Sequence, residues 1–178
     1  MTIKQPTNAL TANGVKDIPV ASEGFIYNHT MLRVKDPVKS LEFYTGVLGM
    51  TLLKHRSFPD AKFDLYFLAK LTVDERNNLP AGDELKDFVS RQRSILELTH
   101  NYGTEDDDSF SYHDGNSDPR GFGHICFSVP NLADAVAWFD ANGVEFKKRP
   151  EEGSMKDIAF IKDPDGYWVE IIEINNNR

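Results

Sequence analysis

Cysteine is almost absent from this sequence: Cys126 is the only one in 178 residues, so a disulfide within the chain is impossible. The chain also lacks an apolar run long enough to cross a membrane, and its N-terminus lacks the basic and then apolar pattern of a secretion signal. These absences predict a protein of the reducing cytoplasm that makes no membrane contact. We expect Cys126 to be a packed thiol rather than a nucleophile.

Positive charge is scarce as well. The 28 acidic residues outnumber the 20 lysines and arginines, giving a formal net charge of -8, which argues against a general nucleic-acid binder. Hydrophobic residues make up 40% of the chain and include 12 phenylalanines. This composition indicates a globular protein, and the length suffices for one domain or two tightly fused modules.

Two strand-like stretches begin in the same way. Residues 124–129 read HICFSV, and their alternation predicts a strand with His124, Cys126 and Ser128 on one face. Residues 29–34 read HTMLRV and have the same form. Each stretch precedes a helix-like segment, for which Asp36 and Asn131 are the expected N-caps.

Three further strand-like segments follow each predicted helix. They lie at 51–53, 63–69 and 94–100 in the first copy, and at 144–146, 158–162 and 167–174 in the second. Each copy therefore reads β-α-β-β-β. An internal repeat decides architecture, and this one predicts an α+β fold in which two paired βαβββ modules form a curved mixed sheet.

The domain boundaries follow from the repeat. We expect a flexible N-terminal arm over 1–24, or a strap that orders against a partner. The first module spans 25–102, with a polar insert at about 70–93 that holds a short helix at 83–89. An acidic, solvated connector at 103–120 leads to the second module at 121–178. Together the modules form one domain.

Each predicted module begins with a strand histidine and ends on a strand glutamate flanked by apolar residues. The four residues are His29, Glu97, His124 and Glu170. If the modules pack into one curved sheet, these side chains converge inside its cleft, and two imidazoles with two carboxylates suit Zn²⁺ or Ni²⁺. The alternative is that each histidine is a hydrogen-bonded core residue and each glutamate faces solvent. Their equivalent places in the repeat favour the metal.

Strand parity adds polar groups to the same face. His29 and Arg33 lie an even number of residues apart, as do Glu97 and Asn101. A guanidinium and an amide beside a metal suit a ligand that bears a carboxylate, although Arg33 can equally be a surface charge. Apolar side chains are available to line the cleft or to fill the core: Phe58, Phe63, Leu65, Phe67, Met155 and Phe160.

Several strings closely resemble the glyoxalase I (lactoylglutathione lyase) family of the vicinal-oxygen-chelate superfamily. They are HTMLRV at 29–34, FYTGVLGM at 43–50, LELTHN at 96–101, DPRGFGHI at 118–125 and AFIKDPDGYWVEI at 159–171. The resemblance covers roughly residues 25–174. It implies the vicinal-oxygen-chelate (glyoxalase) fold and a homodimer with active sites at the subunit interface, each completed by both chains.

The resemblance also implies roles for individual residues. The implied metal ligands are His29, Glu97, His124 and Glu170. The implied contacts to the two ends of glutathione are Arg33 and Asn101, and Arg120 and Lys148. Gly153 and Met155 fall in the loop that closes over the substrate. Glu170 is the expected catalytic base, and Glu97 is suited to the opposite epimer of the substrate.

The implied activity is isomerisation of the methylglyoxal–glutathione hemithioacetal to S-lactoylglutathione, which detoxifies methylglyoxal. The arm and the insert resemble the zinc-using class. The first ligand here is His29, whereas the animal enzymes have glutamine there, and this histidine is also compatible with nickel. Three alternatives on the same fold are a thioester epimerase, an extradiol dioxygenase and a non-enzymatic dimer that sequesters small molecules. The four retained ligands argue against the last two.

Overall fold

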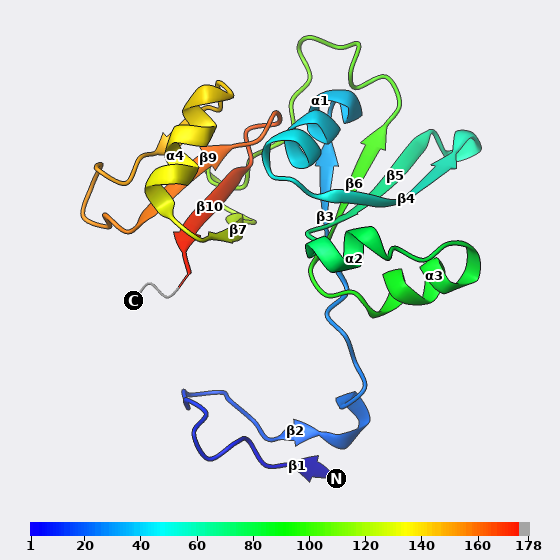
Figure 1. Cartoon of the computed structure of the whole chain (residues 1–178), viewed down its shortest axis with the longest axis vertical. Coiled ribbons are helices and arrows are strands. Elements are labelled where there is room, and N and C mark those ends of the chain that lie inside the picture. The colour runs from blue at the N-terminus through cyan, green and yellow to red at the C-terminus, as the bar shows by residue number, and fades with distance from the viewer. Residues whose placement is uncertain (175–178) are drawn as a thin grey trace.

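The computed structural model of the chain describes residues 1–174, so positions 175–178 of the expected second module lie outside the described residues. Two four-stranded sheets make up the body of the molecule, one for each copy of the repeat (Figure 1). Among the described residues, no helix combines the length and apolar character needed to cross a membrane.

The first module is a mixed sheet with a helix on one face. Its elements are β3 (His29–Val34), α1 (Pro37–Leu41), η2 (Glu42–Val47), β4 (Thr51–Phe58), β5 (Phe63–Ala69) and β6 (Ile95–Asn101). The strand order is β3-β6-β5-β4. β3 and β6 are parallel, whereas β5 is antiparallel to both of its neighbours.

The second module repeats this topology. Its elements are β7 (His124–Val129), α4 (Leu132–Ala141), β8 (Phe146–Lys148), β9 (Ile158–Lys162) and β10 (Trp168–Glu173). The strand order is β7-β10-β9-β8, with β7 and β10 parallel. The predicted repeat of βαβββ modules and the mixed sheets are therefore confirmed. The predicted strand at 51–53 is longer than expected, and the one at 144–146 begins two residues late.

Both predicted N-caps are confirmed. The Asp36 carboxylate accepts hydrogen bonds from the first free amides of α1, and Asn131 Oδ1 accepts one from Asp134 N at 2.9 Å. Such caps satisfy backbone donors that have no partner within the helix. α1 continues into η2, a stretch of wider π-type turns, and Gly49 follows with a φ of 65°. A left-handed residue here suits glycine, which has no Cβ to clash.

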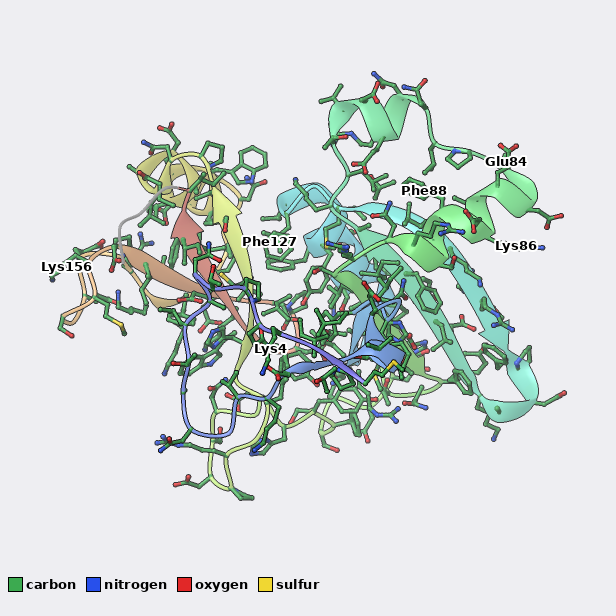
Figure 2. All side chains as sticks on the ribbon, turned by 90° about the horizontal axis from the view of Figure 1, so that it is seen from below. Lys4, Glu84, Lys86, Phe88, Phe127 and Lys156 are labelled. Carbon is green, nitrogen blue, oxygen red and sulfur yellow. The ribbon has the colours of Figure 1, made fainter. Side chains whose placement is uncertain are left out.

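The insert holds two helices, α2 (Val73–Asn77) and α3 (Gly82–Arg91). The predicted helix at 83–89 is part of α3, but α2 was not predicted, although Thr72 and Glu75 form the capping box that marks its start. Figure 2 shows Glu84 and Lys86 of α3 pointing away from the body of the protein. Phe88, on the same helix, packs against a small apolar cluster of the first sheet.

The N-terminal arm lies apart from both modules (Figure 1). Its β1 (Thr2–Ile3) pairs antiparallel with β2 (Ile18–Pro19), and η1 (Val20–Ser22) follows. The elements of the arm are short and largely exposed. A strap that orders against a partner stays a prediction for this segment.

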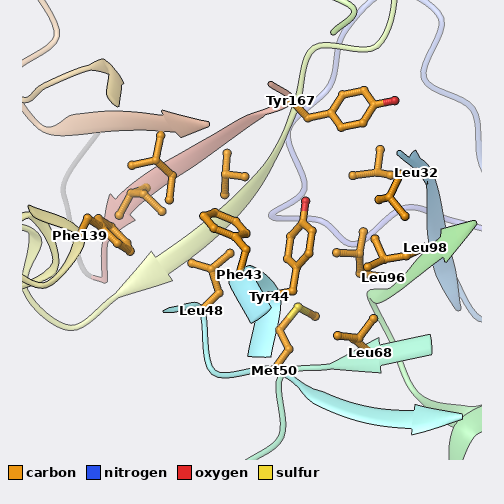
Figure 3. Close-up of a cluster of buried hydrophobic side chains, with 14 of the residues drawn as sticks. Leu32, Phe43, Tyr44, Leu48, Met50, Leu68, Leu96, Leu98, Phe139 and Tyr167 are labelled. Carbon is orange, nitrogen blue, oxygen red and sulfur yellow. The ribbon is translucent and has the colours of Figure 1, made fainter. Parts of the chain in front are cut away.

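The two modules share one hydrophobic core, shown in part in Figure 3. Tyr44 of η2 is fully buried there, and its hydroxyl donates a hydrogen bond of 2.7 Å to Asp163 Oδ2, in the turn between β9 and β10. The other oxygen of Asp163 accepts from the backbone amides of Asp165 and Tyr167. The turn of the second module is thus anchored in the first.

Burial raises the pKa of the Asp163 carboxyl from 3.8 to about 7, which makes folding stability depend on pH. A folded-state pKa above the unfolded value means that the folded protein binds the proton more tightly, so this group's contribution is complete below about pH 4 and is lost as the pH rises to about 7. We expect the free-energy difference between the wild type and Asp163→Asn to fall across that window.

Denaturant unfolding at several pH values measures this difference, in which the other carboxylates largely cancel. Above about pH 7 the difference should be constant. A difference that is flat between pH 4 and pH 7 would show that the carboxyl titrates normally in the folded protein.

Candidate active site

In the first module, a histidine and a glutamate face each other from neighbouring strands. His29 on β3 lies opposite Ile95 on the parallel β6, so Glu97 lies two positions further along. Alternation places both side chains on one face of the sheet, and His29 Nε2 lies 3.2 Å from Glu97 Oε2. The imidazole is 43% exposed and the carboxylate 13%, so a ligand can reach the pair from solvent.

The second module holds a copy of this pair. His124 on β7 lies opposite Trp168 on the parallel β10, and Glu170 lies two positions further along. His124 Nε2 is 3.4 Å from Glu170 Oε2, and the two side chains are 40% and 14% exposed. In both pairs the glutamate lies two positions beyond the residue opposite the histidine, an offset that we call the stagger. The distances and exposed fractions also agree, as expected of a duplicated site.

A phenylalanine completes each copy. Phe67 on β5 lies opposite Glu97, and Phe160 on β9 lies opposite Glu170. The first ring meets His29 edge-on at 6.2 Å between centroids, and the second meets His124 at 5.2 Å in a similar arrangement. The sequence suggested both rings only as possible lining; their equivalence follows from the observed register. They give each pair one apolar wall.

The expectation that all four metal-ligating candidates converge within one chain is wrong. The two sheets share no strand pairing, and residues 1–174 contain no group of three or more His, Cys, Asp or Glu side chains that could hold a metal ion. The reason lies in the core. Leu98 and Val169, next to Glu97 and Glu170, are fully buried in the core that the modules share, so the face with the His–Glu pair is turned away from it in each sheet.

Each pair nevertheless has the chemistry and spacing of half a metal site. Nitrogen and oxygen ligands of zinc lie about 2.1 Å from the ion, so two of them at right angles are about 3 Å apart. The observed separations of 3.2 and 3.4 Å fit this geometry. One imidazole and one carboxylate are too few for a complete site, whereas two such halves supply two nitrogens and two carboxylates.

Arg33 and Asn101 repeat the stagger of His29 and Glu97 further along the same strands. Arg33 lies opposite Thr99, two positions before Asn101, and its Nη1 donates a hydrogen bond of 2.7 Å to Asn101 Oδ1. The predicted shared face is confirmed. The guanidinium has further N–H donors that can hold a carboxylate.

The other candidates for ligand binding lie in the second module and in the segment before it. Lys148 Nζ donates to the carbonyl oxygens of Arg149, Met155 and Ile158, which ties it to the loop that contains Gly153. Arg120 is exposed, 3.7 Å from an Asp118 carboxylate oxygen. Within residues 1–174, no hydrogen bond or ion pair joins Lys148 or Arg120 to Arg33 or Asn101.

The expectation of a packed thiol at Cys126 is wrong. Cys126 is exposed, because the alternation that turns His124 outward turns every second residue of β7 outward as well. In the register with β10, it lies opposite Glu170. The sheet face that carries His124 and Glu170, the second half-site, therefore also carries the thiol.

Comparisons with known proteins agree with this geometry. The sequence profile of the Glyoxalase/Bleomycin resistance protein/Dioxygenase superfamily matches residues 26–171. A lactoylglutathione lyase of Pseudomonas aeruginosa is 53% identical over 156 residues, which cover 88% of this chain and 86% of that relative. One of Pseudomonas putida is 55% identical over 154 residues, covering 86% and 87%.

A solved structure gives the same result for the fold. The trypanothione-dependent glyoxalase I of Leishmania major superimposes with a TM-score of 0.62 at 29% identity, covering 84% of this chain and 87% of that one. The paired modules described above are therefore shared with a solved enzyme structure.

Proposed function

Because this chain belongs to the Glyoxalase/Bleomycin resistance protein/Dioxygenase superfamily, we propose that it is a lactoylglutathione lyase, or glyoxalase I. It isomerises the hemithioacetal of methylglyoxal and glutathione to S-lactoylglutathione. The observation that carries this proposal is the His–Glu pair that recurs with one stagger in both modules. The relatives at 53% and 55% identity, both named lactoylglutathione lyase, support it.

A metal ion is held, in this proposal, by two matched halves: His29 with Glu97, and His124 with Glu170. When bound, the ion supplies Lewis acidity that stabilises the negative charge formed when the weakly acidic C1–H of the substrate is removed. Zinc is favoured, and nickel also suits two imidazoles and two carboxylates.

Because the halves do not meet within one chain, the proposed enzyme is a homodimer. The first half-site of one protomer faces the second half-site of its partner, and a two-fold axis produces two equivalent sites. Both half-sites lie on sheet faces directed away from the core of their own chain, where a second copy can cover them.

Glu170 is the proposed base that removes the C1 proton and returns it to C2. Its carboxylate is 14% exposed beside the Phe160 ring, so it is partly shielded from water that would compete for the proton. Glu97 holds the equivalent position in the other half. It is therefore suited to the opposite epimer of the hemithioacetal, which presents its C1 proton from the other side.

The glutathione part is held by its charged ends. Arg33 and Asn101 bind one carboxylate-bearing end, and Arg120 and Lys148 bind the other. Gly153 and Met155 lie in the loop that Lys148 contacts, and this loop closes over the thiol-linked carbon chain. Four polar groups of this kind allow a protein with a net charge of -8 to bind an anionic peptide. A cytoplasmic location fits the single cysteine and the thiol substrate.

Metal removal tests the proposal. Protein stripped with a chelator should lose thioester formation from methylglyoxal plus glutathione, and titration with Zn²⁺ should restore it with one equivalent per protomer. The increase in thioester absorbance measures the rate. A parallel titration with Ni²⁺ sets the metal preference, since recovery with nickel alone would keep the function and reject zinc.

A folded protein that binds metal and yields no thioester would contradict the lyase assignment. A thioester epimerase would then be favoured. Stripped protein that binds neither metal would instead favour a dimer that sequesters small molecules.

A further inference from the structure

Asn28, immediately before the first histidine, contacts both that histidine and the insert. Its Nδ2 lies 3.0 Å from the carbonyl oxygen of Val89, 3.2 Å from that of Ser90 and 3.1 Å from that of Gln92. Its Oδ1 lies 3.0 Å from His29 Nδ1. A single amide therefore joins the end of α3 to the imidazole of the first half-site.

These contacts fix which atom of the amide faces which neighbour. Carbonyl oxygens only accept hydrogen bonds, so the three of them require the NH₂ group of Asn28 on their side. Its Oδ1 must then face His29. Because an amide oxygen also only accepts, His29 Nδ1 has to carry the hydrogen of that bond. Nε2, 3.2 Å from Glu97 Oε2, is thereby the nitrogen directed at the metal site.

The three carbonyls are available because α3 ends there. The last turn of a helix leaves carbonyl groups without donors inside the helix, and Gln92, the C-cap that follows α3, is already extended, with a ψ of 153°. The Val89 carbonyl accepts from this cap amide at 3.3 Å and keeps a second lone pair for Asn28. The end of α3 is held in place by Phe88 and Val89, which pack against the cluster that contains Ile95. The backbone of Asn28 is fixed as well, since Ile95 N donates to its carbonyl oxygen at 2.8 Å.

We propose that Asn28 is a positioning residue that fixes the ring of His29 with Nδ1 protonated and Nε2 presented to the metal. One role of the insert is then to hold the Asn28 side chain in place. This inference rests on the proposed metal site and goes beyond it, because it gives an ordering role to a residue that touches neither metal nor substrate. A metal-bound histidine is oriented by the partner of its other nitrogen, and loss of that partner weakens metal binding.

The second half-site is built differently. Gly123 precedes His124 and has no side chain, so the position equivalent to Asn28 offers no amide to the ring. Asn116 instead donates to the backbone carbonyl of Gly123 at 2.6 Å. This bond holds the backbone before His124 and does not involve the imidazole. The second module also lacks a counterpart of the insert. The two halves thus match in their ligands and differ in the residue before the histidine, which is asparagine in the first and glycine in the second.

Nuclear magnetic resonance of histidine-labelled protein tests the proposal directly. The Nδ1 proton of His29, assigned by its absence in His29→Gln, should be present and should exchange slowly with water in the wild type, with and without zinc. In Asn28→Ala its exchange should become fast. Zinc affinity, measured by competition with a chelating dye, should fall about 10- to 100-fold.

Asn78→Ala is the matched control. Asn78 follows α2 as its C-cap within the same insert, and its Nδ2 donates to the carbonyl of Asp74. This change therefore also removes a capping amide but lies away from His29. It should change neither the proton exchange nor the zinc affinity. A merely structural role for Asn28 would leave the ring proton unchanged once the variant is folded.

Fast exchange of the Nδ1 proton in the wild type overturns the proposal, and that measurement does not depend on whether Asn28→Ala folds. Unchanged zinc affinity in a folded Asn28→Ala protein overturns it as well. Because the ring proton is observed without metal or substrate, a protein that lacks lyase activity but shows the slow proton would refute the proposed function alone.

Discussion

Glu170→Gln is expected to lower kcat/KM for the hemithioacetal by about 10²- to 10⁴-fold, the usual contribution of a positioned general base. Glutamine keeps the shape and one oxygen that can still face His124, but an amide cannot accept the C1 proton at neutral pH. Because Glu170 is also a proposed metal ligand, the comparison is made at saturating zinc, where the loss should fall on kcat with little change in KM.

The control for this variant is Glu145→Gln. Glu145 is an exposed residue next to β8 that pairs with Lys162, so its change removes one carboxylate from the same module and should leave the rate unchanged. Glu97→Gln is the equivalent change in the other half, and its loss of kcat compared with that of Glu170→Gln measures how much each carboxylate contributes to proton transfer. Activity of Glu170→Gln within about tenfold of the wild type would remove Glu170 from the role of base.

Mixing two inactive variants is expected to restore activity. A Glu97→Ala chain has a defective first half-site, and a Glu170→Ala chain has a defective second one. If each site joins a half from each protomer, a mixed dimer carries both defects in one site and none in the other. Random association makes about half of the dimers mixed, so the mixture should recover about a quarter of the wild-type rate.

The matched control combines two defects of the same half. Chains with His29→Ala and with Glu97→Ala place one defect in every site of the mixed dimer, and no activity should return. Equal rates in the two mixtures, after subunit exchange by dilution and reconcentration, would contradict a site shared between protomers. Native mass spectrometry, with one of the two chains labelled with heavy isotopes, checks that mixed dimers form in both cases.

Much of the fold could be predicted from local sequence patterns. The alternation of residues 29–34 and 124–129 and the caps Asp36 and Asn131 all act over a few residues, and local chemistry decides them. The repeat then gave the topology, because two copies of one pattern constrain each other. The composition of each His–Glu pair followed from the same repeat.

What the sequence did not reveal depends on contacts between distant segments. Convergence of His29 with His124 was expected within one chain. Which face of each sheet is buried, however, depends on how the two modules pack against each other, and local patterns do not determine that packing. The burial of Asp163 is of the same kind, since its partner Tyr44 lies in the other module. Asn28 was overlooked because the carbonyls that hold it belong to the insert. The helix α2, in contrast, had a local signal in Thr72 and Glu75.

The common stagger of the two His–Glu pairs has a consequence for how such proteins diversify. Since both modules offer the same pair in the same register, joining two copies of the gene head to tail would give one polypeptide with four modules and two separately encoded sites. Mutations could then alter one site while the other kept the original activity. In the proposed homodimer every substitution is inherited by both sites at once, so neither can diverge alone.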